Sequence, residues 1–386
     1  MTQFTGPEAN FIVACLAGEL QDQQGVSTAP TDMDWEKLGL LLEKNRLAAH
    51  FYSLGLKHPG LFPDDLCDRL RQARYENLLY GDQCRLEVRE VLDKLRATGI
   101  PVIVMKGWAL IHTLYGGDYA QRFCEDIDIL IPPDRVDEAE ALLHELNYAG
   151  TQEVHPGYSR RFSNARAYLQ TGESSAPFRK FAIGLHWGLT HYPYFDKKRI
   201  NHTELFSRSR PLQVAGVDVL EFCPEDQLIY ICAHLALHHR NQETLLNYFE
   251  IAAIIHLAGK NLDWQQVIDR SQGWGYLAQV QYVLRQVALF WPGVIPTDVL
   301  LRKVSWKERQ IDKLVANTKG NRFYSALVEF LTMPGIGNKV SATFQQLFPD
   351  REFMQVRYCI TPGEKLLPYY FKRLSAGLSS ITNPRK

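Results

Sequence analysis

The sequence predicts an α+β protein in which a small mixed β-sheet core stands between two helical regions. Apolar residues recur at helical spacing over residues 1–99 and again over residues 223–386. Between them, residues 100–222 contain short apolar runs bounded by glycine and proline, as strands do. We therefore expect an N-terminal helical region at 1–99, a sheet-containing core at 100–222 and a C-terminal helical domain at 223–386.

In the first region, helical spacing predicts helices over Phe11–Leu20, Asp34–Leu56 and Tyr80–Thr98. Gly99 follows the last of them, at the position where glycine commonly ends a helix. This region is therefore expected to be helical throughout and to pack against the core.

The core is expected to alternate strands and helices. Expected strands are Ile100–Met105, Cys124–Ile131, Phe181–Trp187 and Val217–Phe222, and expected helices are Gly107–Tyr115 and Asp134–Leu146. Residues 150–180 are interpreted as a hairpin with a mobile loop.

The C-terminal domain returns to helical spacing. Expected helices are Pro224–His239, Leu245–Ala258, Asp263–Gln272, Tyr276–Leu289 and Trp306–Lys313. The aromatic and basic tail at 368–374 is interpreted as a helix that docks on the body of the protein, in preference to a membrane-surface segment.

Composition narrows the class of protein. Of the 386 residues, 46% are hydrophobic, and 43 basic side chains balance 43 acidic ones, which argues against a general attraction to nucleic acid. Seven cysteines without a C-x-x-C motif fit free thiols in a reducing compartment. The sequence begins without the basic segment of a signal peptide and has no apolar run long enough to span a membrane, so we expect a cytoplasmic protein. It indicates no oligomeric state.

Two aspartates on one strand carry the strongest chemical signal. Asp126 and Asp128 are two residues apart in the segment Asp-Ile-Asp-Ile-Leu-Ile, so their carboxylates share one face while Ile127, Ile129 and Ile131 point into a core. Two adjacent carboxylates repel each other, and Mg²⁺ commonly relieves this while also binding substrate phosphates. The pair therefore indicates phosphate chemistry with Mg²⁺ or Mn²⁺.

A strand, the Lys106-Gly107 turn, a helix and then the Asp-x-Asp strand resemble the core of the nucleotidyltransferase superfamily. Together with Arg122, they resemble the family of uncharacterised nucleotidyltransferases. Further matching segments are Gly184-Leu185-His186-Trp187, the helix from Pro224 through His234 and His238, and Leu347-Phe348-Pro349…Met354…Arg357-Tyr358. The resemblance extends over most of the chain from about residue 40 onward.

The resemblance implies transfer of a nucleoside monophosphate from an NTP, ATP being favoured, to an acceptor, with release of pyrophosphate. Gly107 would let the backbone approach the triphosphate, Lys106 would add a charge there, and Arg122 would bridge a phosphate or hold the aspartate strand. Asp126 and Asp128 would carry the metal. The neutral net charge favours a small molecule, peptide or protein as acceptor over tRNA.

One departure from the family concerns a third carboxylate, which the family carries two residues before the histidine of the His-Trp pair. Here that residue is Gly184. His186 lies on the same strand face and can act as base or ligand, and loop carboxylates at Asp118, Glu125 or Glu173 are alternatives. A degenerate core that binds a nucleotide for regulation is the competing hypothesis, and a toxin–antitoxin component is a third that the long helical regions disfavour.

Several other residues allow two interpretations. His234 and His238 have the i, i+4 spacing of zinc ligands, but Leu235 replaces the glutamate of His-Glu-x-x-His, so packing or lining of the cleft is favoured. Glu250 either faces the nucleotide or caps a helix. The basic segment with Arg160, Arg161 and Arg166 fits a loop that binds phosphate or the acceptor and fits a solvated surface loop equally well.

Overall fold

The computed structural model describes residues 4–21, 29–171, 181–190, 199–240, 242–316, 322–361 and 363–382. Within these residues, seven strands form one sheet in the order β3-β4-β5-β2-β1-β7-β6. The strands are β1 (Ile103–Met105), β2 (Asp126–Leu130), β3 (Tyr148–Gly150), β4 (Ala165–Gln170), β5 (Ala182–His186), β6 (Arg210–Val214) and β7 (Val217–Glu221). The pairs β2–β5 and β1–β7 are parallel and the other pairs are antiparallel, so the predicted mixed sheet is confirmed.

The N-terminal region is helical, as predicted. Its helices are α1 (Pro7–Leu20), α2 (Trp35–Lys44), α3 (Ala48–Lys57) and α4 (Asp64–Ala97). The helix predicted at 80–98 is therefore the second half of α4, which is 34 residues long.

The single helix predicted over Asp34–Leu56 is wrong, because the chain breaks between α2 and α3. Arg46 lies in the break with φ of 60°, a conformation that a helix cannot contain. The side-chain amide of Asn45 donates to the Leu41 carbonyl, and its Oδ1 accepts a hydrogen bond from the Leu245 backbone N–H, 200 residues along the chain. A long-range contact thus stabilises a break that helical spacing cannot reveal.

The remaining helices cover the sheet. Within and beside the core they are α5 (Lys106–Tyr115), α6 (Val136–Glu145), α7 (Tyr158–Phe162) and α8 (His202–Arg208). After the sheet come α9 (Pro224–His238), α10 (Leu245–Ala258), α11 (Trp264–Trp274), α12 (Leu277–Phe290), α13 (Thr297–Leu301), α14 (Trp306–Ala316), α15 (Arg322–Thr332), α16 (Ile336–Leu347), α17 (Arg351–Tyr358) and α18 (Leu367–Thr382). The short 3₁₀ segments Pro133–Arg135 and Gly259–Asn261 complete the described helices.

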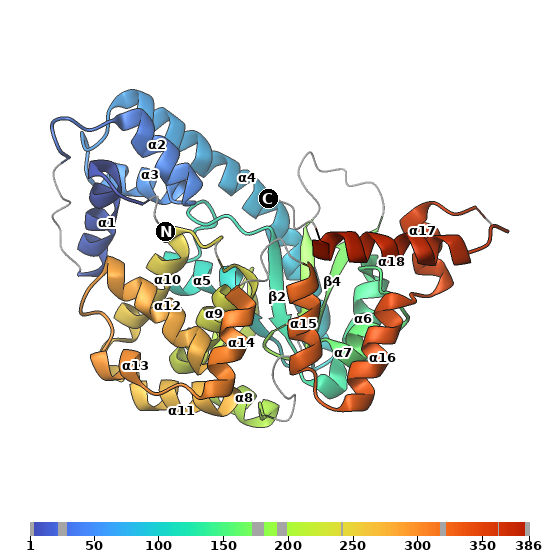
Figure 1. Cartoon of the computed structure of the whole chain (residues 1–386). Coiled ribbons are helices and arrows are strands. Elements are labelled where there is room, and N and C mark those ends of the chain that lie inside the picture. Colours follow the sequence, from blue (N-terminus) through green and yellow to red (C-terminus); the bar gives the residue numbers. More distant parts are fainter. Residues whose placement is uncertain are drawn as a thin grey trace.

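In Figure 1, α1–α3 and α9–α14 lie to one side of β2, and α6, α7 and α15–α18 lie to the other. The tail helix α18 docks on the body as predicted, since the Tyr370 hydroxyl donates to the Pro349 carbonyl and Arg373 donates to the Gln346 carbonyl. No helix among the described residues is long and apolar enough to cross a bilayer.

Residues 150–180 differ from the simple hairpin that was predicted. They contain α7 and β4, and β4 pairs antiparallel with both β3 and β5. The loop expected within this hairpin falls largely on residues 172–180, outside the described part of the chain.

The two faces of the sheet contribute to two hydrophobic cores. One core joins the first face of the sheet to the N-terminal helices and to α9–α12, and it contains Ile103, Met105, Leu130, Phe51, Tyr230 and Ile251. The other joins the second face to α4, α5 and α6, and it contains Val104, Ile127, Ile129, Ile183, Val91 and Leu143. Helices from both ends of the chain therefore share one core, and the three-region division stays a prediction.

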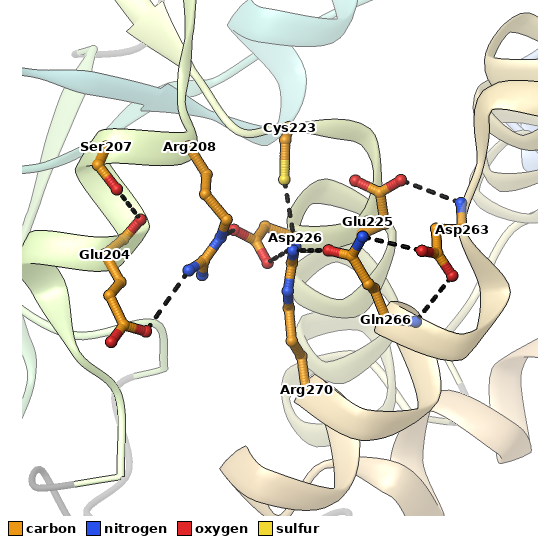
Figure 2. A network of polar contacts seen from close by, with 9 residues as sticks. All are labelled: Glu204, Ser207, Arg208, Cys223, Glu225, Asp226, Asp263, Gln266 and Arg270. Atoms are coloured by element: carbon orange, nitrogen blue, oxygen red, sulfur yellow. Dashed lines mark hydrogen bonds and ion pairs between the residues drawn. The ribbon is translucent and has the colours of Figure 1, made fainter.

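Helix α9 is fixed at its start by a buried ion-pair network (Figure 2). Asp226, which is 1% exposed, accepts hydrogen bonds from Arg208 Nε at 3.1 Å and from Arg270 Nη1 at 2.9 Å. Arg208 belongs to α8 and Arg270 to α11, so one carboxylate joins three helices. The network thus ties the first turn of α9 to α8 and α11.

Candidate active site

The predicted aspartate pair lies in the centre of the sheet, on β2. Asp126 pairs in register with Ala182 and Asp128 with Gly184 on the parallel neighbour β5. Ile127, Ile129 and Ile131 all belong to the second hydrophobic core, which confirms that the side chains alternate. Asp126 and Asp128 consequently point to the face that α9 covers.

Lys106 contacts one member of the pair, Asp128, directly. Its Nζ lies 2.5 Å from Asp128 Oδ2, because β1 and β2 pair with Met105 opposite Asp128 and Lys106 follows immediately. Lys106 has φ of 50°, a left-handed conformation that costs a non-glycine residue on the order of 1–3 kcal/mol. The strained turn and the ion pair together place the ammonium group over the aspartates.

His186 holds the other oxygen of the same carboxylate. Its ring is fully buried, and its Nε2 lies 2.8 Å from Asp128 Oδ1. Burial by itself raises the pKa of Asp128, but the charge of Lys106 and the hydrogen bond with His186 outweigh it and hold that pKa well below its usual range. Asp128 is therefore ionised, and His186 orients it.

Asp126 is the open member of the pair. Asp126 is exposed, and no hydrogen bond or ion pair to its carboxylate occurs within the described residues. Partial loss of hydration raises its pKa, and the negative charge of Asp128 raises it further. An added cation would relieve this repulsion.

These residues fit a Mg²⁺ ion that is held by one or two carboxylates together with the phosphates of a bound nucleotide. Mg²⁺ is often bound by one or two carboxylates together with substrate phosphates and water. Asp126 can supply an oxygen at once, whereas Asp128 can do so only after Lys106 turns away from it. Among the described residues, no group of three His, Cys, Asp or Glu side chains is arranged to hold a metal ion by itself. Phosphate oxygens and water would have to complete the shell.

The strand position of the missing carboxylate has no space for a side chain. A Cβ on Gly184 would overlap Asp128 Oδ1 and would lie 3.3 Å from His186 Nε2. The inward turn of Asp128 towards His186 thus occupies the space that an acid at 184 would need.

We expect that Gly184→Asp will not supply the third carboxylate and will instead damage the site. Because β5 is paired on both sides, the backbone cannot move away, and overpacking of this kind costs about 1–3 kcal/mol of unfolding free energy. Urea denaturation of Gly184→Asp and Gly184→Ala measures the loss. The control is Gly273→Ala on α11, where an added Cβ meets open space. Higher pyrophosphate release by Gly184→Asp than by the unaltered protein would contradict the prediction.

Arg122 and Gly107 make contacts within the protein, and their phosphate-binding roles stay a prediction. Arg122 donates to Glu250 through Nε at 2.5 Å and Nη2 at 3.2 Å, so of its two predicted roles the structure shows the one that holds the aspartate strand. A Cβ on Gly107 would lie 2.5 Å from Cys124 Sγ and 2.8 Å from Arg122 Nη1. Glycine is required there because this side of the turn is already filled.

Glu250 neither caps a helix nor is left to bind a nucleotide. It is 2% exposed within α10, and besides Arg122 it accepts a hydrogen bond from the Tyr115 hydroxyl at 3.3 Å. The Arg122–Glu250 pair therefore ties the loop before β2 to the C-terminal helices.

Two residues of α9 that lie near the aspartates were not fully recognised from the sequence. Tyr230 is completely buried, and the charges of Asp128 and Asp126, after burial itself, raise its pKa. His234 follows one turn later, and its Nε2 lies 3.1 Å from His239 Nε2. The i, i+4 spacing identified His234 and His238 as a pair; the recurrence of 230, 234 and 238 on one face is the signal that would have added Tyr230.

The loop candidates are mostly engaged elsewhere. Asp118 pairs with Arg74 and accepts the Ala120 backbone N–H, which agrees with a turn role. Arg166 pairs with Glu153, and Arg160 donates to the Pro133 carbonyl, so neither is an open phosphate ligand here. Glu125 is exposed at the start of β2, and Glu173 lies outside the described residues.

Two cavities lie away from the aspartates. One of about 810 Å³ is bordered by α11, α14 and the α15–α16 turn, including Gln272, Glu308 and Met333. The other, of about 580 Å³, lies between α12 and α14 and is lined by Arg240, Arg285 and Asp312 among others. Neither contains a residue of the aspartate cluster.

The mixed sheet carries the paired aspartates beside the Lys106-Gly107 turn, as the resemblance to nucleotidyltransferases implied. The family model described as uncharacterised nucleotidyltransferase matches residues 31–292. The chain belongs to this family, which confirms the resemblance for the motifs within residues 31–292; the matching segment at 347–358 lies beyond the matched range.

Two solved structures are similar to parts of this chain. The antibiotic-resistance factor ANT(2'')-Ia is 15% identical, with 54% of this chain and 95% of that chain covered and a TM-score of 0.32. An antigenic nucleotidyltransferase-like protein from Paracoccidioides brasiliensis is 20% identical, with 58% and 94% covered and a TM-score of 0.34. A search among curated proteins finds no match.

Proposed function

We propose that this protein transfers a nucleoside monophosphate from an NTP, with ATP favoured, to an acceptor group, and that it requires Mg²⁺ or Mn²⁺. The observation that carries the proposal is the contact between Lys106 at the start of α5 and Asp128 on β2, with the open carboxylate of Asp126 on the same face. A helix start, a lysine and two carboxylates in one place suit a metal-bound triphosphate.

In the proposed reaction the chain's own groups act by position and charge. The backbone N–H groups at the start of α5 bind phosphate oxygens, and the Lys106 ammonium moves from Asp128 to the phosphates. When bound, the metal ion would stabilise negative charge on the phosphate oxygens, held by Asp126 and Asp128. His186 keeps Asp128 oriented during this exchange.

The acceptor attacks the α-phosphorus and pyrophosphate leaves. We favour a small molecule, peptide or protein acceptor over tRNA, since the chain has equal numbers of basic and acidic residues. We also favour a cytoplasmic location, which suits the seven cysteines that the structure places as free thiols.

A second candidate function is regulatory nucleotide binding without turnover. The specific observation in its favour is that both oxygens of Asp128 are engaged internally, and that Gly184 leaves no space for a third acid. Tight NTP binding without product in a broad acceptor screen would support this candidate.

The test is pyrophosphate release by the purified full chain with each NTP, Mg²⁺ and a panel of hydroxyl and amine acceptors. We expect release by the unaltered protein and none above background for Asp126→Ala combined with Asp128→Ala. The matched control is Asp64→Ala combined with Asp65→Ala, two exposed aspartates in the first turn of α4. Activity that survives the first double substitution would end the assignment.

A further inference from the structure

The face of α9 above the aspartates contains two buried polar atoms without a hydrogen bond. The Tyr230 hydroxyl and His234 Nδ1 find no partner among the described residues, although Tyr230 is fully buried and His234 is only 8% exposed. Buried polar atoms are nearly always paired, with protein, water or a ligand. Two such atoms one helical turn apart therefore indicate a place where a polar group binds.

The location of these atoms points to the reacting centre. The Tyr230 and His234 rings pack together on α9, with their centroids 5.8 Å apart, and α9 covers the face of the sheet to which the aspartates point. The charges of both aspartates act on Tyr230, and those of Lys106 and His186 act on His234. A group held by Tyr230 and His234 would thus lie on the α9 side of the aspartates.

The other nitrogen of His234 leads towards solvent. His234 Nε2 lies 3.1 Å from Nε2 of His239, and His239 is exposed at the end of α9. If His234 donates its Nε2 proton to His239, its Nδ1 presents a lone pair to the buried site. The ring can then accept a proton at Nδ1 and release one at Nε2.

We propose that His234 is the general base for the acceptor, that Tyr230 hydrogen-bonds the attacking oxygen, and that His239 carries the proton to solvent. This inference rests on the proposed nucleotidyl transfer and names the base that Gly184 cannot supply. The acceptor oxygen forms a bond to the α-phosphorus, and the bond from that phosphorus to the bridging oxygen of pyrophosphate breaks. The acceptor proton moves to His234 Nδ1 as the Nε2 proton moves to His239.

The surroundings of His234 keep its ring neutral. Burial lowers its pKa well below the usual range, and the charged or protonatable groups that face it, Lys106, His238, His239 and His186, lower it further. The ring is therefore neutral at neutral pH, as a proton acceptor must be. His186, the base expected from the sequence, has its Nε2 engaged with Asp128 and serves as a positioning residue.

The first experiment needs no acceptor. NMR of the full chain labelled with ¹⁵N histidine, with the His234 signal assigned through His234→Gln, reports which ring nitrogen carries the proton. We expect a neutral His234 with its proton on Nε2 at pH 7. A proton on Nδ1 would overturn the relay.

The second experiment is the pH profile of pyrophosphate release from Mg-ATP, with water, a hexose, a serine peptide and a tyrosine peptide as acceptors. We expect His234→Gln to lower kcat about 10²–10⁴-fold and to remove the acid limb of the profile, with KM for ATP nearly unchanged. Tyr230→Phe and His239→Gln should lower kcat less. The control is His256→Gln, an exposed histidine of α10. If His234→Gln fails to fold, His234→Asn replaces it.

The two experiments distinguish a wrong assignment of the base from a wrong assignment of nucleotidyl transfer. Turnover by the unaltered protein with an unchanged rate and acid limb in His234→Gln would end this inference and leave the nucleotidyl transfer standing. No turnover by the unaltered protein with any NTP and acceptor would end both.

Discussion

Replacement of Glu250 by alanine will lower the free energy of unfolding by about 3–5 kcal/mol, because it leaves a buried arginine without its counter-charge. The side chains of Arg122 and Glu250 are 14% and 3% exposed, and two hydrogen bonds join them. Glu250→Gln should cost less, since its amide oxygen can still accept one hydrogen bond. Chemical denaturation followed by circular dichroism measures both values.

The control for this prediction is an exposed ion pair between a lysine and a glutamate. Glu145→Gln removes the partner of Lys94, and both side chains are more than 40% exposed. Such pairs contribute about 0–1 kcal/mol. Equal losses for Glu250→Ala and Glu145→Gln would contradict the special position of the buried pair.

The same substitution should also affect the site. Arg122 packs against the turn, with its Nη1 2.9 Å from Cys124 Sγ and close to Gly107. Loss of Glu250 releases the guanidinium, and the turn that carries Lys106 loses its support. We therefore expect reduced pyrophosphate release by Glu250→Ala even under conditions in which the variant is fully folded.

Replacement of Asp226 by alanine is expected to have an effect of similar size, about 3–5 kcal/mol, by a different route. Asp226 neutralises two arginines at once, Arg208 and Arg270, whose side chains are 27% and 18% exposed (Figure 2). Without it, two positive charges remain close together between α8, α9 and α11. Denaturation by urea measures the loss of stability.

Asp269→Ala serves as the control for Asp226→Ala. Asp269 lies on α11 and is exposed, where it accepts a hydrogen bond from Gln265. Its replacement should change the unfolding free energy by less than about 0.5 kcal/mol. A loss below about 1 kcal/mol for Asp226→Ala would show that the arginines find other partners.

Elements that depend on local pattern could be predicted from the sequence. The helix predicted over Leu245–Ala258 is found with those bounds, because its own apolar spacing and its Thr244 capping box determine it. Strands β3 and β6 were missed. Most residues of β6 are exposed or half-buried, so it forms through its pairing with β7 and not through an apolar pattern of its own.

In the candidate site, too, features set by local pattern could be predicted and features set by distant contacts could not. The shared face of Asp126 and Asp128 and the nearness of Lys106 were predicted, since both follow from strand alternation and a short turn. The partner of Arg122 could not be predicted, because Glu250 is 128 residues away and the pairing depends on how α10 packs. The contacts of His186 with Asp128 and of His234 with His239 also depend on tertiary packing.

The amino-acid order alone determined which groups are available: two carboxylates on one strand face, a lysine at a helix start, and membership of a nucleotidyltransferase family. Only the tertiary structure decided what these groups contact, by bringing Lys106 and His186 to opposite oxygens of Asp128. The physical reason is the distance along the chain over which each interaction acts. Side-chain alternation arises from neighbouring peptide units, whereas ion pairs and burial depend on which distant helices cover the sheet.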